Sequence, residues 1–434
     1  MAPGGRPAGG GRRDRAGWDY QQFLSHSHPP AVHGLAHGKR AGAWEHTGHR
    51  GARSGTRWVG AGVPARPVVT AQTLAFMRIV VSGYYGFGNG GDEAVLEAIV
   101  GALRARIPQA HVVVLSAAPD QTKSLHGVAG VSRTTGALPA MAGADLFISG
   151  GGTLIQDVTS ARSALYYLGL LGLATVLARA TMVYAAGIGP LRRGWLRTLA
   201  TGVLNRVTLI TVRDEDSRRL LQELAVRRPV QVVADPAFAL EPVPAAEVRD
   251  LVGVPGAPRI GVALRPWRDG GFLEPLVDGL RAACREIGAE VVALAFHPER
   301  DLAVCVQAAR AMGGRALAGL SPREMMAVVG ALDLVVGMRL HALVYAVACG
   351  VPPVGLSYDP KVEGLLTRVG VGRLLPLPAL TAEGVRREVR AAWDERHAVR
   401  ARLAAQAVSL REAALRAADL AAVLLASSAG GRGE

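Results

Sequence analysis

The chain has 434 residues, half of them hydrophobic, so it is long enough to build two domains with sizeable cores. Its formal net charge of +14 is unevenly placed: residues 1–76 hold ten Lys and Arg against three Asp and Glu, which is half of the excess. The other residues show no basic stripe interleaved with aromatic side chains, so we expect no nucleic-acid partner.

The first 76 residues are dominated by Gly, Arg, His, Ala and Pro and follow neither a helical nor a strand period. They predict a disordered, low-complexity extension, although the six histidines among them also leave metal binding open. No apolar segment follows the early arginines, so we expect no secretory signal. Met77 opens a typical first strand, and we expect the native protein to begin there or to carry the upstream stretch as a tail.

From Met77 onward, short apolar runs alternate with helical segments, the rhythm of a doubly wound parallel sheet. Two such series are separated by a proline-rich stretch, and together they predict an α/β protein with two Rossmann-like domains facing a cleft. The predicted parts are a domain at 77–240, a linker at 241–258, a domain at 259–380 and a helical segment at 381–434. The expected strands are 78–82, 111–115, 145–149, 182–186, 208–212, 230–233, 259–264, 289–295, 332–336 and 352–356.

Two other features concern membrane contact and the redox state of the cysteines. The apolar run 164–178 stops at Arg179, about 15 residues where a membrane span needs roughly 20. It predicts either a buried helix or a helix on a membrane surface, and Arg192, Arg193 and Arg197 just downstream suit the second interpretation. The three cysteines lie far apart in apolar runs and predict reduced thiols in the core of a cytoplasmic protein: Cys284, Cys305 and Cys349.

A glycine-rich loop joins the first strand to a helix, reading Gly-Tyr-Tyr-Gly-Phe-Gly-Asn-Gly-Gly-Asp-Glu from Gly83. Its glycines allow tight turns and close approach to a ligand, and Asn89 and Asp92 lie where the helix begins. Asp92 is either a helix cap or a base that takes a proton from a sugar hydroxyl.

Ser-Gly-Gly-Gly-Thr follows a later strand, and the amides of Gly151 and Gly152 are candidates to hold an anion or a sugar hydroxyl. Close backbone packing explains the same triplet equally well. The triplet is not a phosphate-binding loop of the Walker type, because no Gly-Lys-Ser/Thr follows it.

Three further residues lie at strand ends. Arg213 precedes three acids, so it either pairs with them or points into the cleft as a fork for carboxylate or phosphate. Arg265 has the matching place in the second domain, with the same two interpretations. His297, in Phe-His-Pro, is more often structural than catalytic.

The most informative run is Leu-Val-Val-Gly-Met-Arg-Leu-His, an apolar strand that ends in Arg339, Leu340 and His341. Twenty residues after His341, Lys361 is one of only three lysines in the chain, which suggests that a compact ammonium is needed there. Cations and an imidazole at one sheet edge predict a site for a small, multiply charged anion with a proton donor beside it.

Taken together and in chain order, these motifs resemble the polysaccharide pyruvyl transferase family, and within it the bacterial CsaB type. The motifs are Tyr-Tyr-Gly-Phe-Gly-Asn-x-Gly-Asp-Glu, Ile-Ser-Gly-Gly-Gly, Val-Arg-Asp-x-x-Ser, and Arg-Leu-His followed by Lys. The likeness runs from Met77 to about residue 375. The N-terminal extension and the extra glycine in Gly90-Gly91 depart from it, and the second affects the shape of the loop.

The resemblance implies a GT-B-like fold and phosphoenolpyruvate as a co-substrate, without a cofactor or a metal. It implies a 4,6-linked pyruvate ketal on N-acetylmannosamine of a secondary cell-wall polysaccharide, used for S-layer anchoring. His341 would be the acid and Asp92 the base. The resemblance implies that the donor is bound by Arg339, Leu340, His341, Lys361 and Arg213, and that the acceptor is bound by the loop with Asn89 and Asp92. Three more candidates come only from their position at the end of a strand: Arg265 for the donor, and Gly151 and Gly152 for the acceptor.

The expected acceptor is a lipid-linked or polymeric cell-wall glycan, and the expected location of the protein is the cytoplasm or the inner face of the cell membrane. The main alternative is a GT-B nucleotide-sugar glycosyltransferase of cell-envelope biosynthesis. Such enzymes usually place a carboxylate in the second domain for the ribose hydroxyls, whereas residues 337–350 contain no acid. A non-catalytic carbohydrate- or lipid-binding protein is the third interpretation, and it leaves the cationic cluster without a purpose.

Overall fold

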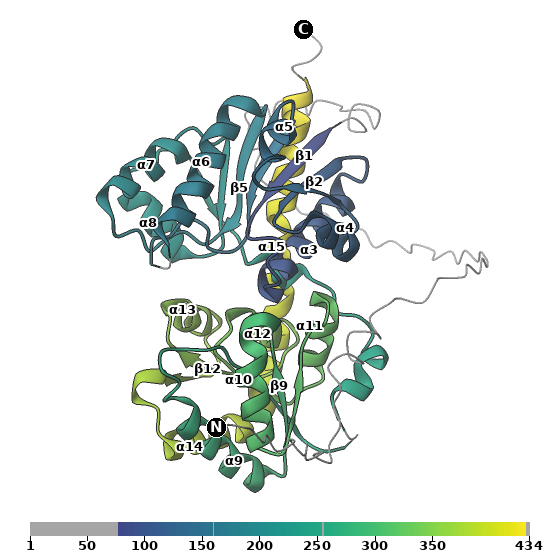
Figure 1. Cartoon of the computed structure of the whole chain (residues 1–434), viewed down its shortest axis with the longest axis vertical. Coiled ribbons are helices and arrows are strands. Elements are labelled where there is room, and N and C mark those ends of the chain that lie inside the picture. Colours follow the sequence, from purple (N-terminus) through teal and green to yellow (C-terminus); the bar gives the residue numbers. More distant parts are fainter. Residues whose placement is uncertain (1–76, 159, 254–255, 431–434) are drawn as a thin grey trace, which may run out of the picture. The chain divides into compact units, whose positions relative to one another are not determined.

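Two parallel β-sheets with flanking helices organise the chain from Met77 onward (Figure 1). The computed structural model describes residues 77–158, 160–253 and 256–430, and the predicted extension 1–76 lies outside them. All described residues belong to one unit, Ala65–Glu434. The two sheets confirm the predicted α/β class with two Rossmann-like halves.

The first sheet has seven strands in the order β3-β2-β1-β4-β5-β6-β7, the Rossmann order with one strand added. Ile79 and Val81 pack into the core that holds α3 and α15, whereas Val80 faces the core of α5, α6 and α7. A strand buried on both faces needs an unbroken apolar run, which is why the sequence identified it. The strands are β1 (Arg78–Ser82), β2 (His111–Ser116), β3 (Ala129–Ser132), β4 (Leu146–Gly150), β5 (Ala180–Ala186), β6 (Leu209–Val212) and β7 (Val230–Val232). The helices are α3 (Gly90–Arg106), α4 (Pro119–His126), α5 (Ala137–Met141), α6 (Ala161–Leu177), α7 (Gly194–Leu204) and α8 (Glu215–Glu223).

The second sheet repeats the Rossmann order with six strands, β10-β9-β8-β11-β12-β13. One face packs on α11 and α12, and the other on α9, α10 and α14. The strands are β8 (Arg259–Ala263), β9 (Glu290–Leu294), β10 (Arg315–Leu317), β11 (Leu334–Gly337), β12 (Pro353–Ser357) and β13 (Arg373–Pro376). The helices are α9 (Leu273–Ile287), α10 (Pro298–Ala311), α11 (Pro322–Gly330), α12 (Leu340–Ala348), α13 (Pro360–Val369), α14 (Ala382–Asp394) and α15 (Arg396–Gly430).

Three strands escaped the sequence prediction: β3, β10 and β13. Each has only three or four residues and lies near or at a sheet edge, and β3 and β10 contain no fully buried residue. Such strands lack the long apolar run by which central strands are recognised. The predicted linker contains one short turn of helix, η2 (Ala245–Leu251), and a second, η1 (Pro236–Ala239), lies just before it.

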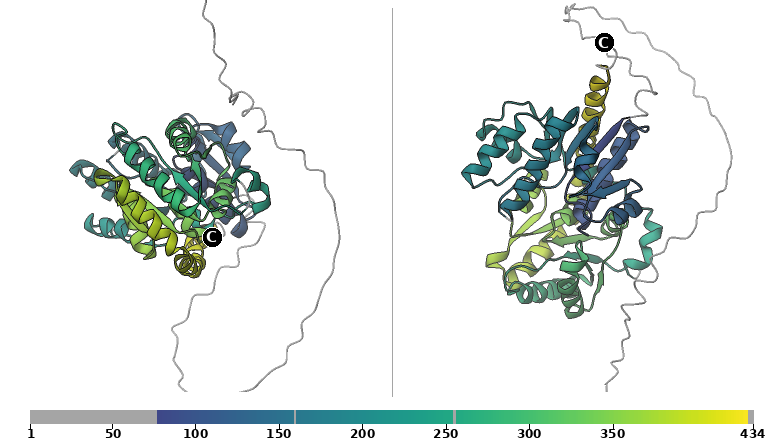
Figure 2. Two further views of the ribbon diagram at one scale, coloured as in Figure 1. Left: turned by 90° about the horizontal axis from the view of Figure 1, so that it is seen from below. Right: turned by 45° about the horizontal axis from the view of Figure 1, so that its top comes forward.

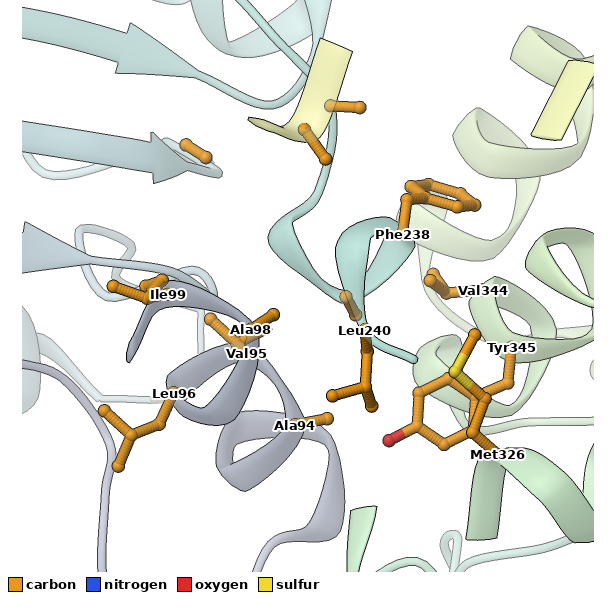
Figure 3. Close-up of a cluster of buried hydrophobic side chains, with 14 of the residues drawn as sticks. Ala94, Val95, Leu96, Ala98, Ile99, Phe238, Leu240, Met326, Val344 and Tyr345 are labelled. Carbon is orange, nitrogen blue, oxygen red and sulfur yellow. The ribbon is translucent and has the colours of Figure 1, made fainter. Parts of the chain in front are cut away.

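One apolar cluster joins elements of both halves. It brings α3 residues such as Ala94 and Ala98 together with Leu240, which follows η1, and with Met326 and Tyr345 of α11 and α12 (Figure 3). Helix α15, yellow in Figures 1 and 2, packs on α3, η1, β5 and α12. The helical segment at the end of the chain is therefore part of the core and not a separate appendage.

Two predictions about the surroundings can be compared with the structure. Cys284, Cys305 and Cys349 are free thiols, and the first two are buried, as predicted. Among the described residues, every helix is too short or too polar to cross a membrane.

Candidate functional site

The predicted site residues follow the carboxyl ends of β1, β4 and β6 in one sheet and of β8, β11 and β12 in the other, where ligands bind in such sheets. A cavity of about 390 Å³ lies at these strand ends. Its lining comes from the segment after β5, from the start of α8, and from α12 and α13, and it includes Gly187, Arg213, Asp235, Leu340 and Lys361.

Arg213 is buried at the wall of the cavity and held by partners from distant segments. Its guanidinium donates to Asp235 Oδ2 at 2.8 Å and to Thr153 Oγ1 at 3.0 Å, and it lies 3.5 Å from the Asp214 carboxylate. Both sequence interpretations of Arg213 are therefore met in part: it pairs with acids, and it also lines the cavity. Its main partner, Asp235, is not one of the three acids that follow it.

Asp235 connects Arg213 with His341. Its second oxygen lies 4.0 Å from His341 Nε2 and accepts from the amide of Ala237 at 3.1 Å. Burial alone would raise the pKa of Asp235, but the charges of Arg213 and His341 outweigh it and hold the pKa below its usual value. Asp235 is thus an ionised carboxylate between two candidate site residues.

His341 lies in the first turn of α12, and its imidazole packs against the glycine loop. A Cβ atom added to Gly91 would lie 2.1 Å from His341 Nδ1. His341 Nε2 is buried and has no hydrogen-bond partner among the described residues. Burial is the main cause that lowers the pKa of His341, and Asp235 opposes the shift. The cations that lower this pKa further are Arg213, Arg339 and Lys361.

The glycine loop brings Asn89 and Asp92 to the same place. Asn89, not Asp92, caps α3: its side chain accepts from the amide of Gly91, and its amide nitrogen bonds to the Asp92 carboxylate. Burial raises the pKa of Asp92 to about 7, and repulsion from Glu93 adds to the shift, while Arg213 opposes it. A carboxyl group that titrates near neutrality, next in sequence to the glycine that packs against the imidazole, suits proton transfer.

Gly151 and Gly152 have a structural role that the sequence left open. Both have positive φ angles, +67° and +64°, which suit glycine. The amide of Gly151 donates to Tyr184 O at 3.0 Å, and a Cβ atom there would lie 1.9 Å from Val95. A Cβ atom on Gly152 would come within 3.0 Å of Asp92 Oδ1, so this glycine leaves room for the carboxylate. Neither residue lines the 390 Å³ cavity.

Arg339 caps the start of α12, and its guanidinium is fixed by a buried acid. It forms a two-pronged pair with Asp301, in which Nε donates to Oδ2 at 2.8 Å. Asp301 also accepts from the amide of His297, whose side chain is buried at the start of α10. Arg339 contributes charge close to His341 without lining the cavity.

Lys361 and Leu340 both line the cavity, whereas Arg265 does not. Strand β12 ends at Ser357, so Lys361 lies in the first turn of α13 and not at the strand end itself. Burial lowers the pKa of Lys361, and Asp359 opposes that shift. The guanidinium of Arg265 donates to the hydroxyl of Tyr358 at 3.2 Å and stacks over its ring.

Sequence reasoning missed Thr153, Asp235 and Asp301. Each holds a predicted cation or its neighbour, but each lies in a segment whose local pattern gives no sign of that contact. An acid just after a strand, in Val-Ala-Asp-Pro, was the available signal for Asp235. Within the described part of the chain, no group of three His, Cys, Asp or Glu side chains could hold a metal ion.

Comparisons with known proteins identify the family and the fold. The sequence profile of polysaccharide pyruvyl transferases matches residues 89–360, more than half of the chain. No curated protein is significantly similar in sequence. Among solved structures, UDP-GlcNAc 2-epimerase from Neisseria meningitidis bound to UDP-GlcNAc has a TM-score of 0.54 at 10% identity, covering 78% of this chain and 98% of that one. Anabaena HepE in complex with UDP and glucose has a TM-score of 0.51 at 16% identity, covering 77% and 97%. These likenesses show a GT-B-like fold.

Proposed function

We propose, because the chain belongs to the polysaccharide pyruvyl transferase family, that it transfers pyruvate from phosphoenolpyruvate to a cell-wall polysaccharide as a ketal. The finer assignment is a 4,6-linked ketal on N-acetylmannosamine of a secondary cell-wall polysaccharide, of the CsaB type, for S-layer anchoring. One observation carries the proposal. His341, whose buried Nε2 has no hydrogen-bond partner among the described residues, lies close to three cations and follows Leu340, which lines the cavity.

The charges of the site suit the donor. Phosphoenolpyruvate carries a carboxylate and a phosphate, and fixed cations bind such groups by charge-assisted hydrogen bonds. Arg213 and Lys361 line the cavity from opposite sheets, and Arg339 adds positive charge beside His341. The same cations would stabilise phosphate as it leaves. Arg265 is bonded to the hydroxyl of Tyr358 and does not line the cavity, so of the candidate cations it has the weakest support as a donor ligand.

The proton balance of the reaction requires an acid and a base. The methylene carbon of the donor gains one proton and becomes a methyl group. Two sugar hydroxyls each lose a proton as their oxygens bond to the central carbon, and the carbon–oxygen bond to phosphate breaks. One of the two released protons balances the methyl group and the other leaves with phosphate. We assign the acid to His341 and the base to Asp92.

Burial favours the neutral form of both groups, because it lowers the pKa of His341 and raises that of Asp92 to about 7. The donor's negative charge would raise the pKa of His341, because an anion stabilises the imidazolium. Donor binding is therefore expected to bring a proton to His341, from Asp92 or from solvent.

The acceptor is expected on the side of the glycine loop, with Asn89 and Asp92 near its hydroxyls. Gly152 supports this side indirectly, because it leaves room for the Asp92 carboxylate. The amide of Gly151 is already bonded to Tyr184, which leaves it unable to hold a sugar hydroxyl as well.

A nucleotide-sugar glycosyltransferase is the second candidate, because similar folds have been solved with UDP or UDP-GlcNAc. Calorimetric titration of the purified protein with phosphoenolpyruvate and, separately, with UDP-GlcNAc distinguishes the two. We expect binding of phosphoenolpyruvate only, weakened at least tenfold in Arg213→Ala. Binding of UDP-GlcNAc alone would favour the glycosyltransferase. His341→Ala should bind the donor more weakly and lose turnover, and full turnover in that variant would remove its assignment as the acid.

A further inference from the structure

Helix α6 exposes an apolar stripe to the surface. Its exposed residues are Arg162, Leu165, Gly169, Leu173 and Val176. At about 100° per residue they fall within an arc of roughly 80°, so all five lie on one side of the helix. Val176 is 78% exposed, and no charged residue occurs between Arg162 and the end of the helix. A surface helix of a globular protein normally places charged side chains on this side.

The apolar stripe lies in a segment without acids. Residues 158–213 contain seven arginines and no Asp or Glu. Arg213 belongs to the cavity, and the other six are partly or fully exposed: Arg162, Arg179, Arg192, Arg193, Arg197 and Arg206. Arginines around an apolar stripe form the pattern of helices that lie in the interface of an anionic membrane.

Helix α7, which packs against α6, adds an exposed aromatic side chain. Trp195, in its first turn, is 52% exposed and follows the exposed residues Arg192 and Arg193. Helices α6 and α7 pack against each other and are seen side by side in Figure 1. Tryptophan is enriched at membrane interfaces because its ring is apolar and its N–H group can still reach water.

A buried carboxylate holds this surface next to the cavity. Asp157 accepts the amides of Arg192 and Arg193 at 2.8–2.9 Å, and its own amide donates to Pro190 O at 3.1 Å. Pro190 and Leu191 line the cavity directly before the two arginines. The arginines are thus presented by an ordered loop whose other end is the rim of the site.

We propose that the α6–α7 face, comprising Leu165, Leu173, Val176, Arg192, Arg193 and Trp195, docks on the surface of an anionic lipid bilayer. The apolar stripe and Trp195 enter the interface, and the arginines contact the lipid phosphates. The consequence for the acceptor rests on the proposed function: a bilayer bound at this face would present a lipid-linked glycan at the rim of the cavity.

The test is co-sedimentation of the full chain with phosphatidylcholine vesicles, with and without phosphatidylglycerol. We expect binding only when phosphatidylglycerol is present. Arg192→Ala/Arg193→Ala should bind about 25-fold more weakly, since each arginine near an anionic surface contributes about a fivefold factor. The matched control is Arg402→Ala/Arg416→Ala, which removes two exposed arginines from α15 and should bind nearly as the wild type does.

A second pair of variants tests the apolar stripe. Leu165→Ser/Val176→Ser changes two exposed residues, so it should melt as the wild type does and bind vesicles more weakly. Equal binding by all variants, or no binding of the wild type to anionic vesicles, would overturn the proposal. Self-association lost in the serine variant, without vesicle binding, would instead assign the face to a second copy of the chain. Titration with phosphoenolpyruvate should be unchanged in every variant, which separates this proposal from the proposed function.

Discussion

Replacing Gly91 by alanine tests the contact between the two sheets at the candidate site. The added Cβ would lie 2.1 Å from His341 Nδ1 and 2.7 Å from its Cγ, whereas ordinary contacts begin near 3.4 Å. The ring must therefore move by about 1 Å or more. The His341 side chain is only 13% exposed and Asp235 Oδ1 lies 4.0 Å from its Nε2, so the ring has little room to do so.

Gly101→Ala is the matched control, because Gly101 lies in the same helix and a Cβ there meets nothing within 4 Å. Alanine in a helix is favoured over glycine by roughly 0.5–1 kcal/mol, so the control should be more stable than the wild type. Overpacking a buried site is unfavourable by about 1–3 kcal/mol. Gly91→Ala should therefore be less stable than Gly101→Ala by roughly this amount.

The assay is urea unfolding of both variants, with the free energy of unfolding compared at a common slope. Donor titration gives a second readout: phosphoenolpyruvate should bind at least tenfold more weakly to Gly91→Ala, because the imidazole is displaced, and normally to Gly101→Ala. The reasoning is refuted if the two variants are equally stable and bind the donor with equal affinity.

Four other predictions concern charge. Asp235→Asn should lower the free energy of unfolding by about 3–5 kcal/mol, because it leaves buried Arg213 without its main partner. The control is Asp419→Asn, which changes an exposed pair with an arginine and should lower the free energy of unfolding by less than about 1 kcal/mol. Urea unfolding measures both values. Because the pKa of Asp92 is raised, the folded protein keeps a proton that the unfolded chain loses between pH 4 and about 7, so the free energy of unfolding of the wild type falls across this window. The stability of Asp92→Asn relative to the wild type should therefore grow with pH in this window and level off above it. A stability difference that stays constant with pH would show that the pKa of the carboxyl is not perturbed. Lys361→Arg should weaken donor binding nearly as much as Lys361→Ala, because a planar fork cannot replace a compact ammonium in the cavity wall, and near-normal kinetic constants would show that any cation suffices. Turnover should also survive EDTA, since cations already cover the donor's charge, and a loss restored by Mg²⁺ would contradict this.

The sequence by itself determined the fold class and the position of the candidate site. The central strands are buried on both faces and so appear as apolar runs, and the residues after them must gather at one edge of a parallel sheet. Arg213, His341 and Lys361 could therefore be named as candidates before the structure, and the order of the motifs indicated the family. The short strands near the sheet edges were missed because they lack that apolar signal.

Only the tertiary structure decided which groups meet. Asp235 lies 22 residues from Arg213, Asp301 lies 38 from Arg339, and Gly91 is far removed in sequence from His341, yet each pair is in contact. The pattern along a chain reports burial and backbone conformation, which are local properties. Pairing between side chains from different strands depends on how the sheets and their helices pack, and so do the pKa shifts that follow from burial and from neighbouring charges.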